Sequence, residues 1–351
     1  MSAPARLNLS REQILAFRQR AGALDARLPA GPSSLRQAAW AGLQDSMPRA
    51  ALLSLHARVE GVQPNTWEDP SLIQVWGPRY SAYVISADDR AVFTLGRLPA
   101  DAAGLRRVQE TADRLEAFLE GRRMSYAEAG RALGIDPNGL RYAAPTGRVL
   151  IRWEGARRPL VWTVPAPDVD PEVARLELAR RYLHVAGPTT AESFATWAGI
   201  RPRAGQAAFA ALAAELLPVS TPIGNAWLLA ADEPLVRAHV NPAPARLLPS
   251  GDVYWLLQGR DRELLVLDAE RRPQLWTPRV WPGALLVNGE IVGIWRRDGA
   301  NVTIEQWRPL SPDQRVAIEA EAIMLPLPDV SGQIRITWTQ KPSHRYSIDM
   351  T

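Results

Sequence analysis

A helix-then-hairpin order recurs along the first 240 residues and limits the possible architectures more than any other feature of the sequence. Each copy holds residues with helical periodicity, followed by two short β-prone runs on either side of a turn. Helix starts are indicated where Ser or Thr is followed three residues later by Gln or Glu, at Ser10, Ser125 and Thr189. Several helices followed by a hairpin are typical of a winged helix, so the sequence predicts three tandem winged-helix units. The predicted hairpins cover residues 72–86, 149–164 and 218–229, the last with its turn at Gly224-Asn225.

The copies also share a weak internal repeat, because residues 127–135 and 191–200 align with one gap. Beyond about Arg246 the pattern changes to short β-prone runs, with a strong hairpin turn at Asn288-Gly289 and one late helix that begins after Ser311. Such spacing predicts a small barrel or sandwich, and the whole chain is α+β. Helices are predicted over residues 10–22, 34–43, 47–61, 102–120, 125–134, 171–183, 189–199, 203–217 and 311–323. C-terminal strands are predicted over residues 254–257, 263–267, 285–287, 291–295, 302–307 and 334–339. The expected domains are 1–100, 101–168, 169–240 and 241–351.

Composition excludes several classes of site. The chain has no cysteine and only 4 histidines, which are far apart, so thiolate metal sites and a cysteine nucleophile are excluded and we expect no metal and no cofactor. No apolar run of about 18 residues occurs and the N-terminus does not resemble a signal peptide, so we expect a soluble cytoplasmic protein. No obligate protein partner is visible. Basic residues number 41 against 37 acidic ones, and the net charge of +4 permits nucleic-acid binding without establishing it.

Four stretches of the chain resemble the winged-helix DNA-binding family that contains the AlkZ-like DNA glycosylases. They occur in the family's order and span nearly the whole chain. The resemblance implies three tandem winged helices followed by a C-terminal β-barrel. It also implies that the partner is double-stranded DNA carrying bulky N-alkylated purines, and it is compatible with self-resistance to a DNA-alkylating natural product. The stretches are residues 42–61, 181–194, 258–265 and 285–296.

The family's catalytic signature is Gln-x-Gln or Gln-x-Asp with an apolar middle residue, and the corresponding residues here are Gln44, Asp45 and Ser46, so both Asp45 and Ser46 depart from it. An N7-alkylated purine is already cationic and leaves without a strong acid, so hydrolysis needs mainly a well-oriented water. Gln44 both donates and accepts hydrogen bonds, which suits that task, and we expect it to face an arginine-lined channel. Ser46 reaches less far, and Asp45 is a candidate base. The alternative is an ordinary helix end with Ser46 as the N-cap.

The second predicted hairpin is the most basic patch, with five arginines against Glu154 within residues 141–158. Arginine on a hairpin is well suited to contact phosphates, which fix the position of DNA without reading its sequence. The alternative is a solvated charged hairpin. A second candidate is the pair of arginines around Asp261, which is either an oriented DNA contact or a structural ion network. The DNA-binding candidates are Arg141, Arg148, Arg152, Arg157, Arg158, Arg260 and Arg262.

Three functions remain open from the sequence. The first is a DNA glycosylase, a hydrolase that removes bulky N-alkylated purines with a water positioned by Gln44. The second is a non-catalytic binder of double-stranded DNA, because Ser46 stands where the family has Gln or Asp. The third is a transcriptional regulator, which is disfavoured because neither a dimerisation module nor a ligand-binding module is visible.

Overall fold

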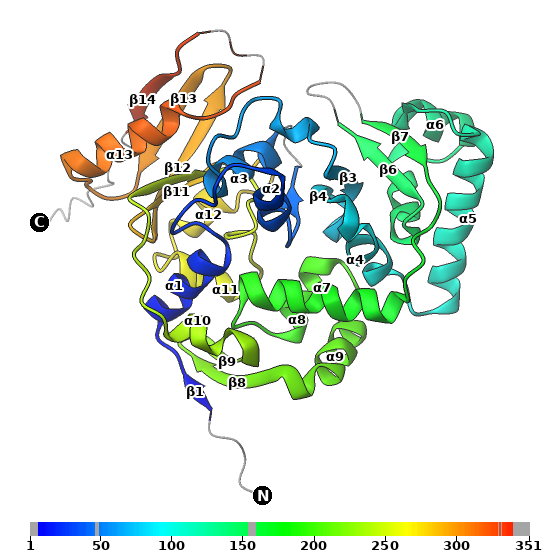
Figure 1. Ribbon diagram of the computed structural model, residues 1–351, viewed down its shortest axis with the longest axis horizontal. Coiled ribbons are helices and arrows are strands. Elements are labelled where there is room, and N and C mark those ends of the chain that lie inside the picture. The colour runs from blue at the N-terminus through cyan, green and yellow to red at the C-terminus, as the bar shows by residue number, and fades with distance from the viewer. Residues whose placement is uncertain (1–5, 46–48, 154–158, 329, 331, 340–351) are drawn as a thin grey trace, which may run out of the picture.

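The computed structural model describes residues 6–45, 49–153, 159–328, 330 and 332–339, and it is an α+β protein in which helices flank three separate sheets (Figure 1). Arg157, Arg158 and Ser46 of the sequence predictions lie outside the described residues. No described helix is long and apolar enough to span a membrane.

The N-terminal region begins as the sequence predicts and then departs from it. The capping box at Ser10 is confirmed, because Ser10 accepts from the Gln13 N–H while the Gln13 side chain accepts from the Ser10 N–H. The next two helices are shorter than predicted, because the chain leaves helical geometry after Ala38 and forms a short strand at Gln44. The elements are β1 Leu7–Asn8, α1 Arg11–Ala21, α2 Pro32–Ala38, β2 Leu43–Gln44 and α3 Ala50–Arg58.

The first two predicted hairpins are confirmed, but they belong to one sheet. Its six strands run in the order β2-β4-β3-β6-β7-β5, and the two hairpins join where Gln74 pairs with Ile151. The first two predicted domains, 1–100 and 101–168, therefore share one sheet. The elements are β3 Leu72–Trp76, β4 Ala82–Ser86, α4 Arg90–Thr94, α5 Ala102–Leu119, β5 Met124–Ser125, α6 Tyr126–Leu133, the 3₁₀ segment Pro137–Thr146, β6 Val149–Arg152 and β7 Leu160–Thr163.

The third helix-and-hairpin segment is also confirmed, with small shifts. Thr190 caps its second helix where the sequence pattern placed the cap at Thr189, and the hairpin turn falls at residues 222–223, one step before Gly224-Asn225. Strand β1, near the N-terminus, pairs in parallel with β8 and forms one edge of this three-stranded sheet. Helix α7 packs against α1, α4, α9 and β9 and forms the centre of the molecule (Figure 1). The elements are α7 Pro171–Ala186, α8 Ala191–Ala198, α9 Pro202–Ala211, β8 Leu216–Thr221, β9 Gly224–Leu229 and α10 Glu233–Arg237.

The C-terminal region forms an open sheet in the order β10-β11-β12-β13-β14, and its two edge strands do not pair with each other in the described residues. No closed barrel is therefore found in this part of the chain, contrary to the expectation. The turn at Asn288-Gly289 is confirmed. Residues 254–257 are buried but lie outside the strands, and the run predicted at 263–267 is mostly helix α11. The elements are β10 Ala245–Leu248, α11 Asp261–Leu265, α12 Arg272–Leu275, β11 Gly283–Val287, β12 Glu290–Asp298, β13 Asn301–Gln306, α13 Pro312–Ile323 and β14 Arg335–Thr339.

Candidate functional site

Gln44 lies at the end of the short strand β2, where it pairs with Tyr83 of β4. Only 7% of the residue is exposed, so in this structure it does not face an open channel. Its surroundings are polar. The Arg79 guanidinium donates from Nη2 to the Gln44 Oε1 atom at 2.6 Å, and the Tyr83 hydroxyl lies 3.4 Å from the same oxygen.

The nitrogen end of the Gln44 amide lies against a glycine. Gly251 has a φ of +73°, and a Cβ added there would lie 2.7 Å from the Gln44 Nε2 atom. Positive φ and this close approach both favour glycine at residue 251. The amide of Gln44 is thus confined between a guanidinium and a backbone that comes unusually close.

Asp45 is fully buried and its carboxylate is bonded on both oxygens. One oxygen accepts from the Ala51 N–H at 3.0 Å, at the start of α3, and the other accepts from the Gln74 amide at 2.9 Å. Gln74 in turn accepts from the Trp153 N–H at 2.6 Å. Burial raises the pKa of the Asp45 carboxyl to about 6, against the opposing effects of the Ala51 N–H and the Arg49 charge. These contacts match a helix cap, which is the role that the sequence alternative gave to Ser46.

Arg152, one of the predicted DNA contacts, lies next to Trp153, which bonds to Gln74. Its guanidinium carbon lies 3.6 Å from the centre of the Trp67 ring, and that of Arg49 lies 3.4 Å from the same centre. Arg49 also donates to the Trp153 carbonyl at 2.7 Å. The second hairpin and the start of α3 are therefore joined through one tryptophan and two arginines.

Arg49 also lines a basic cavity of about 580 Å³. It contains three arginines and one aspartate, and Ser250, which also lines it, directly precedes the Gly251 that contacts Gln44. Sequence reasoning missed Arg296 and Arg297 as candidates, although two adjacent arginines at the end of a predicted strand were a usable signal. The charged lining residues are Arg49, Arg296, Arg297 and Asp298.

The other predicted arginines are dispersed. Arg148 pairs with Asp113 and Glu116 of α5, which neutralise its charge. The Nε atom of Arg141 is buried with no hydrogen-bond partner in the described residues. Their DNA-binding roles remain predictions.

The two arginines around Asp261 also differ from each other. Arg262 donates to the Leu257 carbonyl at 2.9 Å, whereas the Arg260 side chain is 67% exposed and lies 3.6 Å from Glu263. Asp261 itself is buried and accepts from Arg18 and from Ser193, each at 3.1 Å. The acid thus pairs with residues distant in sequence, which favours the structural alternative for Asp261.

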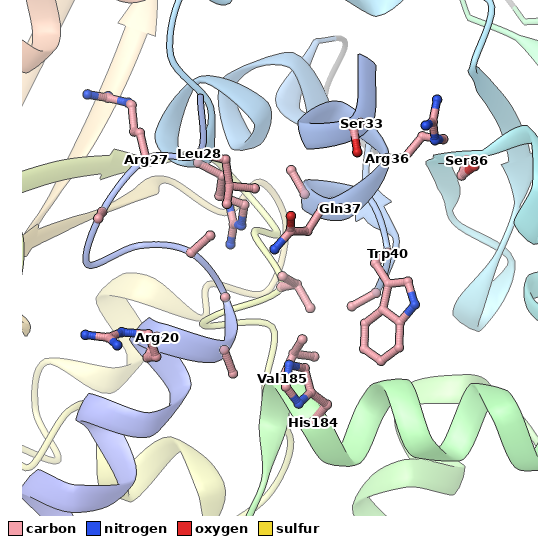
Figure 2. Close-up of a pocket in the computed structure, with 18 of the residues that line it drawn as sticks. Arg20, Arg27, Leu28, Ser33, Arg36, Gln37, Trp40, Ser86, His184 and Val185 are labelled. Atoms are coloured by element: carbon pink, nitrogen blue, oxygen red, sulfur yellow. The ribbon is translucent and has the colours of Figure 1, made fainter. Parts of the chain in front are cut away.

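A larger cavity, of about 1080 Å³, opens between α1, α2 and α7 (Figure 2). The Trp40 ring points toward His184, which contacts it edge-on with ring centres 5.4 Å apart, and His184 Nδ1 lies 2.8 Å from Asp232. Neither Gln44 nor Asp45 lines this cavity. The described residues contain no group of three or more His, Cys, Asp or Glu side chains that could hold a metal ion.

One comparison with known proteins identifies a family, and another identifies a similar fold. The family model for AlkZ-like DNA glycosylases matches residues 38–325. Among solved structures, the Streptomyces sahachiroi DNA glycosylase AlkZ is similar, with a TM-score of 0.77 and 18% identity over 95% of this chain and 100% of that chain. At that identity the likeness establishes the fold. No curated protein matches the chain in sequence.

Proposed function

The chain belongs to the AlkZ-like DNA glycosylase family, and from this premise we propose that it hydrolyses the N-glycosidic bond of bulky N-alkylated purines in double-stranded DNA. The observation that carries the proposal is the family match over a region that includes Gln44, with the Gln44 amide held by Arg79. The helix-and-hairpin segments would act as tandem winged helices that hold the duplex. Self-resistance to a DNA-alkylating natural product fits this substrate class.

The proposed reaction needs no strong acid to protonate the leaving base. Alkylation at N7 makes the purine a cation, so it leaves as a neutral base and the sugar becomes an oxocarbenium-like ion. The catalytic task is then to hold a water against the sugar carbon, which is positioning work. Gln44 would do this with an N–H of its Nε2 group, which donates to the water, because its Oε1 atom already accepts from Arg79 and Tyr83.

Asp45 and Ser46 depart from the family signature, and the contacts of Asp45 support a structural role for it. Both oxygens of Asp45 are occupied by the Ala51 N–H and by Gln74, which leaves little capacity to act as a base. We therefore assign Asp45 to holding the site in shape. Ser46 stays as a candidate second water ligand with short reach.

The proposal is tested by incubating the wild-type protein with duplex DNA that contains a single N7-methylguanine or a bulkier N7 adduct. We expect release of the free base and formation of an abasic site under single-turnover conditions, which avoid any limit set by product release. Unmodified duplex is the control. A protein that binds the duplex and releases no base from any such adduct would be a non-catalytic DNA binder. This is the second candidate function, and it is favoured by Ser46, which stands where the family has Gln or Asp.

Binding to the duplex is expected to depend on the second hairpin. If its arginines contact phosphates, the logarithm of the affinity falls with the logarithm of salt concentration at a slope of about −0.9 per contact. Reversing Arg157 and Arg158 to Glu should weaken binding to every sequence alike and make the slope shallower by about 2. Charge reversal at the exposed Arg308, which is not among the predicted DNA contacts, is the comparison. Equal salt slopes for wild type and the double reversal would remove the hairpin from the interface.

A further inference from the structure

Arg79 lies in the turn between β3 and β4, in a backbone conformation that arginine rarely adopts. Its φ is +53°, in the left-handed region. The turn is closed by hydrogen bonds from Gly77 to Ser81 and from Tyr80 to Gly77, at 2.9 and 3.0 Å. Gly199, which ends α8, packs against it so closely that a Cβ there would lie 3.0 Å from the Arg79 nitrogen. The surrounding structure therefore imposes this conformation, and strained residues of this kind gather at functional sites.

The contact between Arg79 and Gln44 determines which way the Gln44 amide points. A guanidinium only donates, so the atom at 2.6 Å from Arg79 Nη2 has to be the carbonyl oxygen of Gln44. The two ends of a glutamine amide are otherwise nearly interchangeable, because its last torsion angle has a broad, roughly two-fold preference. With Oε1 held by Arg79, the two N–H groups of Nε2 point to the opposite side, toward Gly251.

The surroundings of Arg79 argue against a purely structural role. It forms no ion pair in the described residues, and its Nη1 atom is buried without a hydrogen-bond partner there. Two other cations lie near it. Burial lowers the pKa of Arg97 to about 10, and the charge of Arg79 adds to that effect, as it does for Arg262. The half-buried Arg79 thus lies among other cations and donates to the neutral amide of Gln44.

We propose that Arg79 is a positioning residue, which acts through Gln44 by fixing its amide with Oε1 toward the guanidinium and Nε2 on the opposite side. The proposal rests on the proposed function, in which Gln44 orients the water. A flipped amide would present an acceptor where the reaction needs donors. Tyr83, at 3.4 Å from the same oxygen, is too distant to hold the amide alone.

The test uses Arg79→Gly, because glycine accepts the positive φ and the variant relieves backbone strain. The first measurement is the side-chain amide signal of Gln44 in glutamine-labelled protein, assigned by its loss in Gln44→Asn. We expect the signal to shift toward that of free glutamine in Arg79→Gly and to return when millimolar guanidinium fills the space. The second measurement is single-turnover base release, which should fall by about 100-fold while the affinity for duplex DNA stays within a few-fold.

Guanidinium should restore at least part of the rate to Arg79→Gly and none to the Arg79→Gly/Gln44→Ala double variant. The matched control is Arg308→Gly, which removes an exposed loop arginine and should change neither measurement. An unchanged Gln44 signal in Arg79→Gly overturns the proposal, as does a loss of rate that guanidinium does not relieve. If wild type releases no base, the proposed function fails, and the Gln44 signal alone then decides whether Arg79 orients the amide.

Discussion

Replacing Gln44 with alanine is expected to lower single-turnover base release by at least about 100-fold, which is the lower end of what a positioned catalytic group contributes. A side chain that orients the attacking water acts mainly in the transition state, so the rate falls while the affinity for duplex DNA stays nearly unchanged. The measurement pairs the rate of release of N7-methylguanine with a binding isotherm on the same duplex.

The cost to folding can be separated from the cost to catalysis. Gln44→Ala leaves the Arg79 Nη2 donor without its acceptor, and because this donor is only partly buried the cost is at most that of a buried unsatisfied donor, about 1–3 kcal/mol. Gln44→Glu is the matched variant, because its carboxylate keeps an acceptor for Arg79 and lacks the amide N–H groups, although it adds a negative charge beside that guanidinium. Loss of release in both variants assigns the work to those N–H groups. Full activity in Gln44→Ala, with folding verified, would contradict any catalytic role for this residue.

The rate of base release in Ser46→Ala is compared with the rate in Gln44→Ala. A serine hydroxyl reaches less far than the glutamine or aspartate of the family signature, so its removal should slow release less than the loss of Gln44 does.

The local elements could be predicted from the sequence because their signals are local. The capping boxes at Ser10 and Ser311 form as the spacing indicates, and each of the three predicted hairpins exists. At Ser125 the helix also begins as predicted, but the serine side chain makes no capping bond. What the sequence could not supply is which hairpins share a sheet, because that pairing joins Gln74 to Ile151 across 77 residues.

The errors in the C-terminal region have a physical cause. Residues 254–257 are a short apolar run, and such a run reads equally well as a buried strand or as a buried irregular segment. Here the Asp252 carboxylate accepts from the Tyr254 N–H, and the Trp255 indole donates to the Pro249 carbonyl, which hold the segment as a turn. The next run follows Asp261, which is fixed by Arg18 from the other end of the chain.

The candidate site likewise combines residues that a local motif indicates with residues that are distant in the sequence. Gln44 and Asp45 were proposed from the family signature, which consists of adjacent residues. Arg79 was not, because its link to Gln44 spans 35 residues and depends on a positive φ that the turn sequence does not specify. The contact of Asp45 with Gln74 was missed for the same reason.

That contact leads to the second large effect, which is on stability. Replacing Asp45 with asparagine is expected to destabilise the fold by about 1–3 kcal/mol, because an asparagine N–H₂ would face the N–H₂ of Gln74 and one buried donor would lose its acceptor. Gln74 cannot turn its oxygen toward residue 45 without breaking its bond to the Trp153 N–H. Gln74→Glu alone is expected to be destabilising as well, since it places two carboxylates against each other.

The pH dependence has a definite sign. Burial raises the pKa of Asp45 from 3.8 to about 6 in the folded state, so its stabilising contribution is present at low pH and is lost as pH rises from about 4 through 6. The free energy of unfolding of wild type relative to Asp45→Asn should therefore fall across that range, by about 3 kcal/mol at most. Denaturant unfolding of both proteins at pH 4 and pH 7 measures it. A gap that widens with rising pH would contradict the assignment.

The double variant Asp45→Asn/Gln74→Glu then separates structure from catalysis. The asparagine introduced at residue 45 keeps an oxygen for the Ala51 N–H and donates to the glutamate introduced at residue 74, whose second oxygen accepts from the Trp153 N–H. We expect the double variant to recover most of the stability that either single change loses, as a double-mutant cycle would report. Base release should recover with it, because we assign Asp45 to holding the site in shape through its bond to the Ala51 N–H at the start of α3. A double variant that is stable and binds DNA but releases no base would instead require the negative charge at residue 45 itself, and with it a direct role in the reaction.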